Sequence, residues 1–158
     1  MSTLRIVPAD FADPRLAAFL QAHLDDIAPT APACSQHALD LDGLRSPTVR
    51  LFVVLVATQD GDDLVATGAL AGFSPGEEEL KSMRTDPSRR GQGIGAMMLD
   101  HLVEDARSRG VQRLWLETGS MEFFAPARSL YAAAGFEQCP PFGSYRPDPN
   151  SMFFTKQL

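Results

Sequence analysis

The sequence is poor in the features that mark several large classes of protein. It contains only two cysteines, Cys34 and Cys139, and neither has neighbours at the spacing of a metal-binding motif. We expect no metal site and no disulfide, and we expect both thiols to be buried or half-buried. No apolar run reaches the roughly 18 residues that a membrane span needs, and residues 1–5 do not begin a secretory signal. A cytoplasmic protein with no membrane partner is therefore the expectation.

Basic residues are also scarce. The chain has 14 lysines and arginines against 20 aspartates and glutamates, which gives a formal net charge of −6. An acidic protein lacks a general surface for nucleic acid, so we expect no nucleic-acid partner. The basic residues that do gather are Arg84, Arg89 and Arg90, with Lys81 just upstream. Positive charge concentrated beside a glycine-rich loop indicates an anionic ligand bound at that point.

Hydrophobic periodicity divides the chain into short elements. Apolar residues at helical spacing predict helices at residues 14–26, 35–44, 94–106 and 127–134, the second with Ser35 as its N-cap. Alternating and β-branched runs predict strands at residues 4–7, 50–58, 64–73, 79–85, 113–117, 136–139 and 152–155. The run at 50–58 is apolar almost throughout, so we expect this strand to be buried on both faces of its sheet.

The connections between these elements indicate how they pair. Short turns join the strands at 50–58, 64–73 and 79–85, which predicts an antiparallel meander. A helix then crosses over to the strand at 113–117, so this strand should lie parallel to the last strand of the meander. We therefore predict a single α/β (α+β) domain over residues 1–158, with a mixed sheet of about seven strands and about four helices.

A glycine-rich loop, Arg90-Gly91-Gln92-Gly93-Ile94-Gly95, lies where the last meander strand gives way to a helix. Glycines let the backbone turn tightly and approach a ligand closely. The first amides of a helix have no intrahelical partner and the helix dipole adds positive potential, so phosphate oxygens would bind there. Arg89 and Arg90 could add charge-assisted hydrogen bonds. A turn that only caps the helix is the plainer alternative.

The loop alone does not identify the phosphate ligand. Gly91-x-Gly93-x-x-Ala96 also satisfies the dinucleotide-binding fingerprint, and Glu117 lies about 20 residues further on, where a ribose-binding acid would sit. A dinucleotide fold, however, places the loop after the first strand of a parallel sheet, whereas here an antiparallel meander precedes it. No Gly-Lys-Ser/Thr follows the glycines, which excludes a P-loop. An NAD(P)-binding oxidoreductase stays as the less favoured alternative.

Three blocks, in order, resemble the GNAT (Gcn5-related N-acetyltransferase) superfamily, in particular its small stand-alone bacterial-type members. Arg90-x-x-Gly93-x-Gly95 matches the pyrophosphate motif of that family. Residues 79–87 are similar to its central strand, and residues 130–136, Leu-Tyr-Ala-Ala-Ala-Gly-Phe, to its Leu-Tyr-x-x-x-Gly-Phe signature. The resemblance covers residues 50–139. It implies a GNAT-type mixed sheet and an N-acetyltransferase that uses acetyl-CoA as co-substrate.

The resemblance also implies which residues bind the cofactor. In the family the central strand splays from the next strand and binds the pantetheine arm through its backbone. Met83 would then donate its amide to the thioester carbonyl, and Thr85 would pair with the arm. The family often has an asparagine seven positions before the tyrosine, where this chain has Phe124, a departure that affects that contact. The full implied set is Met83, Arg84, Thr85, Arg90, Gly91, Gln92, Gly93, Ile94, Gly95, Ala96 and Tyr131.

Three residues are candidates for catalysis. Tyr131 corresponds to the family's tyrosine near the sulfur, which would give a proton to the departing thiolate. An aromatic ring packed beneath its helix is the alternative. Glu79 matches the place of a catalytic glutamate in some members, and Glu117 is the second candidate for the base. Glu79 would otherwise belong to a solvated acidic turn with its neighbours, and many such enzymes need no dedicated base.

The acceptor is less well specified than the cofactor. The resemblance implies a site between the first helices, the segment after the strand at 113–117 and the C-terminal hairpin. The candidate residues there are His37, Ser120, Phe123 and Tyr145. We expect a primary amine of a small molecule or peptide, which attacks the thioester directly in a ternary complex. A non-catalytic acyl-CoA-binding regulatory module is the alternative. Dimers are frequent in the family, so a homodimer is a further expectation.

Overall fold

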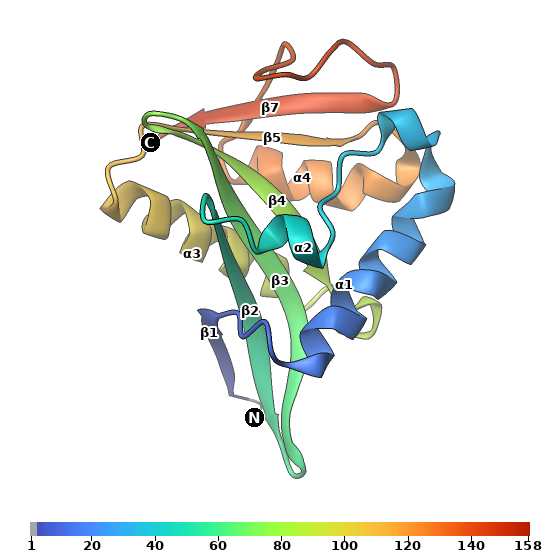
Figure 1. The fold of residues 1–158 in the computed structure, drawn as a ribbon, viewed down its shortest axis with the longest axis vertical. Coiled ribbons are helices and arrows are strands. Elements are labelled where there is room, and N and C mark those ends of the chain that lie inside the picture. The colour runs from blue at the N-terminus through green and yellow to red at the C-terminus, as the bar shows by residue number, and fades with distance from the viewer. Residues whose placement is uncertain (1–2) are drawn as a thin grey trace.

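Seven strands form one mixed sheet in the computed structural model, which describes residues 3–158 (Figure 1). Their spatial order is β1-β2-β3-β4-β5-β7-β6. The strands are β1 (Leu4–Pro8), β2 (Val49–Thr58), β3 (Gly61–Ser74), β4 (Glu77–Thr85), β5 (Arg113–Gly119), β6 (Glu137–Cys139) and β7 (Ser151–Gln157). The helices are α1 (Pro14–Ile27), α2 (Leu41–Leu44), α3 (Ile94–Ser108) and α4 (Ala125–Ala133), and the 3-10 turns are η1 (Ala28–Thr30), η2 (Ala33–Ser35), η3 (Pro87–Arg89) and η4 (Glu122–Phe124).

The pairing of the strands confirms the predicted fold class. The strands β2, β3 and β4 form the antiparallel meander. After the crossover through α3, β5 lies parallel to β4. The strand β7 then pairs antiparallel with β5, and β6 pairs antiparallel with β7 at the edge of the sheet.

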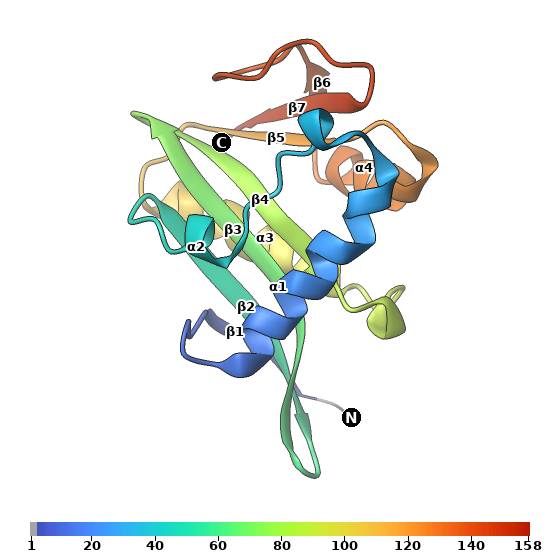
Figure 2. The ribbon, with the colours of Figure 1, turned by 45° about the vertical axis from the view of Figure 1, so that its right-hand side comes forward.

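Helices cover both faces of the sheet, with α1 and α2 on one face and α3 and α4 on the other (Figure 1 and Figure 2). Two apolar clusters result, and β2 contributes to both. Its even-numbered residues from Phe52 to Val56 belong to the cluster with α3, whereas its odd-numbered residues from Leu51 to Leu55 belong to the cluster with α1. Because successive side chains of a strand point to opposite faces, the continuous apolar run in β2 buries residues on both sides, as predicted.

The sheet opens between its two parallel strands. The strands β4 and β5 pair only from Glu77, opposite Arg113, to Leu80, opposite Leu116. Just beyond, Ser82 has a φ of 56°, the left-handed region that favours glycine, and the β3–β4 register shifts between Thr67 and Ala69. The hydroxyl of Thr67 donates to the Ser82 carbonyl at 2.7 Å and supports this irregular backbone. The remainder of β4, residues 81–85, therefore has a free edge facing β5.

Two local predictions were wrong. The predicted helix at 35–44 is absent, because η2 ends at Ser35 and α2 is a single turn capped by Asp40, whose carboxylate accepts from the Gly43 amide at 2.9 Å. The chain between them is extended at Gln36, whose side-chain amide donates to the carbonyls of Ile27, Ala28 and Ala31. These bonds fix the segment after α1 in a non-helical path. The turn after β2 is also tighter than predicted, since β3 begins at Gly61.

The two cysteines form no disulfide. Cys139 is half-buried, as predicted, but Cys34 is exposed, which corrects the expectation that both thiols are sheltered. Cys34 lies in η2 on the outside of the segment that the Gln36 side chain holds in place. Within residues 3–158, no helix is long and apolar enough to cross a membrane.

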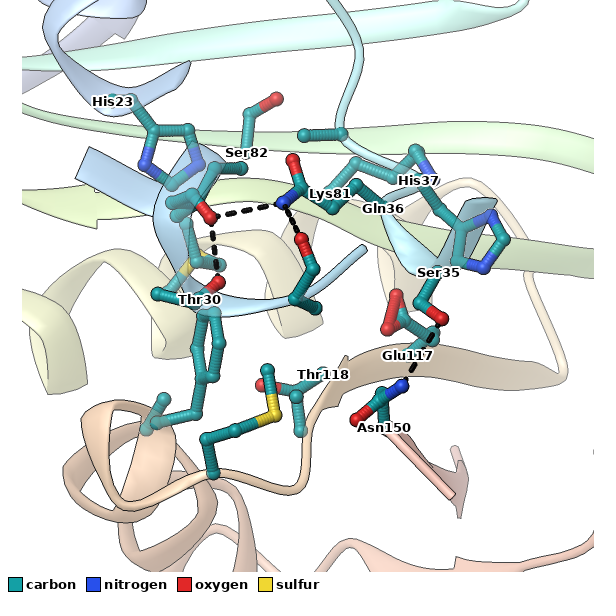
Figure 3. A pocket seen from close by; sticks show the side chains of 18 of the residues that line it. His23, Thr30, Ser35, Gln36, His37, Lys81, Ser82, Glu117, Thr118 and Asn150 are labelled. Atoms are coloured by element: carbon teal, nitrogen blue, oxygen red, sulfur yellow. Dashed lines mark hydrogen bonds between the residues drawn. The ribbon is translucent and has the colours of Figure 1, made fainter. Parts of the chain in front are cut away.

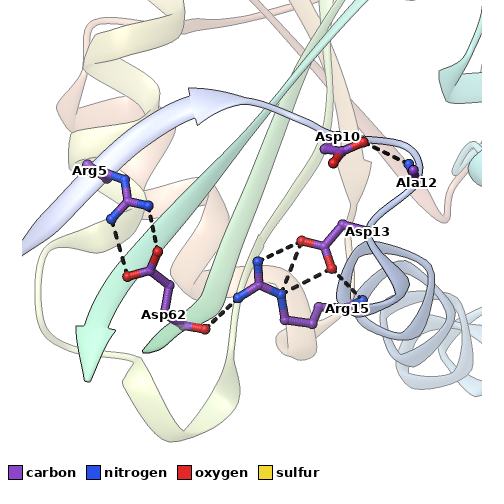
Figure 4. Close-up of polar contacts among 6 residues, drawn as sticks. All are labelled: Arg5, Asp10, Ala12, Asp13, Arg15 and Asp62. Atoms are coloured by element: carbon purple, nitrogen blue, oxygen red, sulfur yellow. Dashed lines mark hydrogen bonds and ion pairs between the residues drawn. The ribbon is translucent and has the colours of Figure 1, made fainter. Parts of the chain in front are cut away.

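Polar contacts of arginines and aspartates join β1 and the start of α1 to the far end of the β2–β3 hairpin (Figure 4). Arg5 on β1 makes two hydrogen bonds to the Asp62 carboxylate, and Arg15 on α1 donates to the Asp62 carbonyl. Asp13 caps α1 by accepting from the Arg15 amide at 2.9 Å. These contacts fix the N-terminal end of α1, whose C-terminal end lies over the opening between β4 and β5 (Figure 2).

Candidate functional site

The predicted cofactor residues gather along one groove, which we call the loop groove. It runs over the end of β4, the loop that follows and the first turns of α3 and α4. Of the predicted set, all but Gln92 line it: Met83, Arg84, Thr85, Arg90, Gly91, Gly93, Ile94, Gly95, Ala96 and Tyr131. Gln92 lies in the loop but is not part of the groove wall. The position fits the predicted roles, which stay predictions.

The backbone of the loop has the geometry of an anion site. Gly91 and Gly93 have φ values of +78° and +79°, and apart from the adjoining residues no atom lies within 4 Å of the place where a Cβ would be at either position. The surface above them is thus open to a ligand. Gly93 is the N-cap of α3 and offers no side chain to the first amides of the helix, so these amides are available to an external acceptor.

The three arginines of the loop groove differ in whether their side chains already pair with other residues. Arg84 turns away from the loop toward α1, where its guanidinium pairs with Asp26 at 2.8 Å and lies 5.3 Å from the Phe19 ring. Arg89 forms a longer ion pair, 3.6 Å, with Asp63. Arg90 has no hydrogen bond or ion pair to any of residues 3–158, so its charge is free to meet an anionic ligand.

A second hollow, the central pocket, fills the opening between β4 and β5. Its walls come from the segment after α1, the free edge of β4, the end of β5 and the start of α4, and include Thr30, Ser35, Ser82, Glu117, Thr118 and Asn150. Figure 3 shows His23 and Thr30 at one side of it and His37, Ser35 and Glu117 at the other. His23, Met83, Phe124, Ala127 and Tyr131 line both the central pocket and the loop groove, so the two hollows meet at these residues.

Tyr131 lies at this junction, on α4. Its ring is 6% exposed and packs edge-on to Phe136. Burial, and then the nearby charge of Glu117, raise the pKa of the Tyr131 hydroxyl well above its usual value, so it is protonated at any physiological pH. The hydroxyl makes no hydrogen bond to residues 3–158. Tyr131 is therefore both an aromatic ring packed beneath its helix and a hydroxyl that can donate a proton.

Glu117 lies on β5 with its carboxylate in the wall of the central pocket. Burial raises its pKa to about 7, an effect that the Ser151 hydroxyl at 3.2 Å and the charge of Lys81 partly offset. A carboxylate with this pKa is ionised in part at neutral pH and can accept a proton from an amine.

Glu79 has a different environment. Its carboxylate accepts from the Tyr145 hydroxyl at 2.5 Å and from the Lys81 ammonium at 3.2 Å, and its side chain is 12% exposed. It lines a third hollow outside the central pocket. Glu79 is therefore not part of a solvated acidic turn, but its lone pairs are engaged. The geometry favours Glu117 as the group facing the central pocket.

His23 was missed from the sequence. It projects from α1, four residues after Phe19 and three before Asp26, into the junction of the two hollows. Burial, and then the charge of Arg84, lower its pKa to about 4, against the opposing effect of Asp26. Its imidazole is thus neutral at neutral pH. The helical spacing to Phe19 and Asp26 places it on the sheet-facing side of α1, but only the tertiary structure shows that it reaches β4.

The predicted acceptor residues do not all lie together. His37 lines the central pocket, and Tyr145 packs edge-on against it with ring centroids 4.9 Å apart. Phe123, 47% exposed, instead lines the loop groove. Ser120 lines none of the three hollows and donates to the Pro149 carbonyl at 2.6 Å, which joins two loops. The four roles stay predictions, and the positions favour His37 and Tyr145.

Several known proteins with similar sequences or folds are named as acetyltransferases. The profile of the acetyltransferase (GNAT) family matches residues 15–136. The chain is 40% identical over 149 residues to the uncharacterized N-acetyltransferase YsnE of Bacillus subtilis, with 94% of this chain and 96% of the relative covered. It is 41% identical over 128 residues to the IAA acetyltransferase of Azospirillum brasilense, with 80% of each covered. An acetyltransferase of the GNAT family from Staphylococcus aureus has a similar fold, with a TM-score of 0.74, 17% identity and 99% of each chain covered.

Proposed function

The chain belongs to the GNAT family of acetyltransferases, and on this premise we propose that it transfers an acetyl group from acetyl-CoA to a primary amine of a small molecule or peptide. The observation that carries the proposal is the junction of the loop groove and the central pocket at Met83 and Tyr131. A thioester held in the groove would present its carbonyl to an amine in the pocket. Membership of this family argues against the alternative of an NAD(P)-binding oxidoreductase. It also favours an enzyme over a non-catalytic acyl-CoA-binding module.

The residues present fit the cofactor. The open backbone at Gly91 and Gly93, the first amides of α3 and the free charge of Arg90 suit a pyrophosphate. The free edge of β4 from residue 81 to residue 85 offers backbone groups to an amide-rich pantetheine arm, as a missing strand would. By this arrangement the Met83 amide would donate to the thioester carbonyl.

Two side chains would handle the protons. Glu117 would take a proton from the amine, directly or through a water, as the amine nitrogen attacks the carbonyl carbon. The bond from that carbon to sulfur then breaks, and the thiolate takes the proton of the Tyr131 hydroxyl. Positioned acid and base groups of this kind each contribute about 100- to 10,000-fold in rate. His23, kept neutral, would line the reaction centre without adding a charge to it.

A ligand screen tests the proposal. Acetyl-CoA and CoA should raise the melting temperature of the protein, whereas NADH and ATP should not. A panel of primary amines with acetyl-CoA should contain at least one that releases free CoA thiol, and Tyr131→Phe should lower kcat for it more than it changes the affinity for acetyl-CoA. Arg90→Gln should weaken the response to acetyl-CoA, and the exposed Arg107→Gln on α3 is the matched control. The absence of any response to either CoA species would contradict the proposal.

A further inference from the structure

Two cationic side chains make no ion pair or hydrogen bond to any of the residues that the structure describes, 3–158. Of the lysines and arginines in residues 3–158, all but Arg90 and Arg146 make at least one side-chain ion pair or hydrogen bond, such as Arg113 to Thr155 or Lys156 to the Ala134 carbonyl. Arg90 lines the loop groove, where an anionic ligand is proposed. Arg146 lines the third hollow, on the other side of the central pocket. An anionic group bound in the third hollow would pair with Arg146 in the same way.

This third hollow, the outer pocket, has an aromatic wall. It lies under the loop between β6 and β7, and Phe73, Phe142, Tyr145, Leu39 and Pro147 contribute to its surface. Phe142 lies 5.8 Å from Phe73 and 5.1 Å from Tyr145, measured between ring centroids. Phe73 is a large apolar side chain, yet 43% of it is exposed to solvent. An apolar or aromatic group bound in the pocket would cover it.

The outer pocket adjoins the central pocket. His37 and Lys81 line both hollows and form the boundary between them. A molecule whose amine lies near Glu117 can therefore extend past these two side chains into the outer pocket. The two hollows together offer room for an acceptor larger than its reacting amine.

The charges are arranged in a definite order along this path. In the outer pocket, the Glu79 carboxylate is compensated by Lys81 at 3.2 Å. Asp148 accepts from the Asn150 amide at 2.8 Å. Neither Arg146 nor Asp148 makes an ion pair to any of residues 3–158, so Arg146 is the cation at that end that is left for an anionic group, while Glu117 is the carboxylate at the inner end. A molecule with an amine at one end and a carboxylate at the other would match both ends.

From these observations, and resting on the proposed function, we infer that the acceptor carries a carboxylate. Its amine reaches Glu117 in the central pocket, its apolar or aromatic body packs on Phe142 and Phe73, and its carboxylate pairs with Arg146 at the mouth of the outer pocket. Arginine suits this role because its planar fork binds a carboxylate through two parallel hydrogen bonds. The enzyme would thus select amino-carboxylates over simple amines.

Matched pairs of amines test the inference. One pair is 4-(aminomethyl)benzoate and benzylamine, and the other is 6-aminohexanoate and pentylamine. In at least one pair, the carboxylated member should have a kcat/KM about tenfold or more above that of its partner, the size expected for one charge-assisted contact. Arg146→Gln should abolish this preference by raising KM, with kcat and acetyl-CoA binding unchanged. Arg107→Gln should keep the preference.

A binding measurement avoids dependence on turnover. With CoA present, 3-phenylpropanoate, which has the carboxylate and the aromatic body but no amine, should bind saturably, and Arg146→Gln should weaken its affinity about tenfold. No saturable binding, or equal affinity in Arg146→Gln and wild type, would overturn the inference. Acetylation of simple amines without a carboxylate preference would overturn it and leave the proposed function standing. Failure of acetyl-CoA to bind would instead contradict the proposed function.

Discussion

The sheet has two halves that differ in how completely they are closed. On one side, β1 pairs with β2 over its whole length, and β2 pairs with β3 from Val49 to Thr58, with apolar clusters on both faces. On the other, the pairing of β4 with β5 stops at Leu80, and the hollow beyond contains the ionisable side chains of His23 and Glu117. The closed half satisfies its own backbone and buries apolar surface, whereas the open half leaves polar groups for a ligand.

The closed half of the sheet offsets the loss of stability that the open half causes. A free strand edge and a buried carboxylate both cost stability. The pairing of β4 with β3 and the apolar cluster with α3 hold β4 in place on its closed side. The contrast predicts that changes in the closed half reduce stability, and changes in the open half reduce activity.

The largest loss of stability is expected in the closed half. Leu70 on β3 is fully buried in the cluster with α3, so Leu70→Ala should lower the free energy of unfolding by about 2–5 kcal/mol. Urea denaturation measures this directly. Leu4→Ala, at a residue that is 38% exposed, is the control and should have a much smaller effect. Equal losses from both variants would break the comparison between buried and exposed positions.

Glu117→Gln should have opposite effects on activity and stability. At pH 8 the rate should fall about 100-fold or more, because the proposed base is gone. Since burial raises the Glu117 pKa to about 7, ionisation of this side chain costs the native state stability as the pH rises from about 4.5 through 7. At pH 8 the variant should therefore be more stable by about 1–2 kcal/mol, and at pH 4 the difference should vanish. In the wild type, kcat/KM should rise with pH through about 7.

A variant that is less stable at pH 8 would contradict the environment assigned to Glu117. A wild-type rate that is flat between pH 6 and 8, with chemistry limiting, would contradict its role as the base. Glu79→Gln is the matched comparison, because its carboxylate is bonded to Lys81 and Tyr145 outside the central pocket. It should lower the rate less than Glu117→Gln does.

His23 gives a smaller and distinct effect of pH. Its pKa is lowered to about 4, so the neutral imidazole contributes stability that is present above about 6.5 and lost as the pH falls toward 4. As the pH falls from about 6.5 to about 4, the free energy of unfolding should decrease less in His23→Gln than in the wild type. Denaturation at a series of pH values measures the difference, and NMR titration of the imidazole should show a midpoint near 4. A midpoint near 6.5 would mean that α1 does not bury this side chain.

The smallest effect is expected at the far end of the β2–β3 hairpin. Asp62→Asn removes an exposed ion pair with Arg5, a kind of contact that contributes little. We expect a slight decrease in melting temperature that disappears at high salt, with an unchanged kcat. A fall in kcat would show that the start of α1 affects the site more than the closed half of the sheet allows.

The sequence predicted the fold well where local patterns determine it. The apolar run of β2, the glycines before α3 and the crossover to β5 each carry their own signal. The segment at 35–44 was wrong because its path depends on Gln36 bonding carbonyls of the preceding turns. A contact of that kind leaves no periodic pattern in the sequence.

The site was less predictable than the fold. The loop groove follows from one continuous motif, so its residues could be named in advance, with only Gln92 outside the wall. The central pocket joins α1, β4, β5 and the loop before β7, which lie far apart in the sequence. Spacing alone could not tell that Glu117 faces this pocket while Glu79 is held by Tyr145, 66 residues away. His23 and Arg146 were missed for the same reason.

Hydrogen exchange with and without acetyl-CoA tests the central claim most directly, namely that the cofactor occupies the open edge of β4. Saturating acetyl-CoA should slow exchange about tenfold or more at amides within residues 81–85, among them that of Met83, the proposed donor, because the ligand replaces water on that edge. Amides at residues 77–80, already paired with β5, should change little. Unchanged exchange at 81–85 in saturating acetyl-CoA would contradict the account.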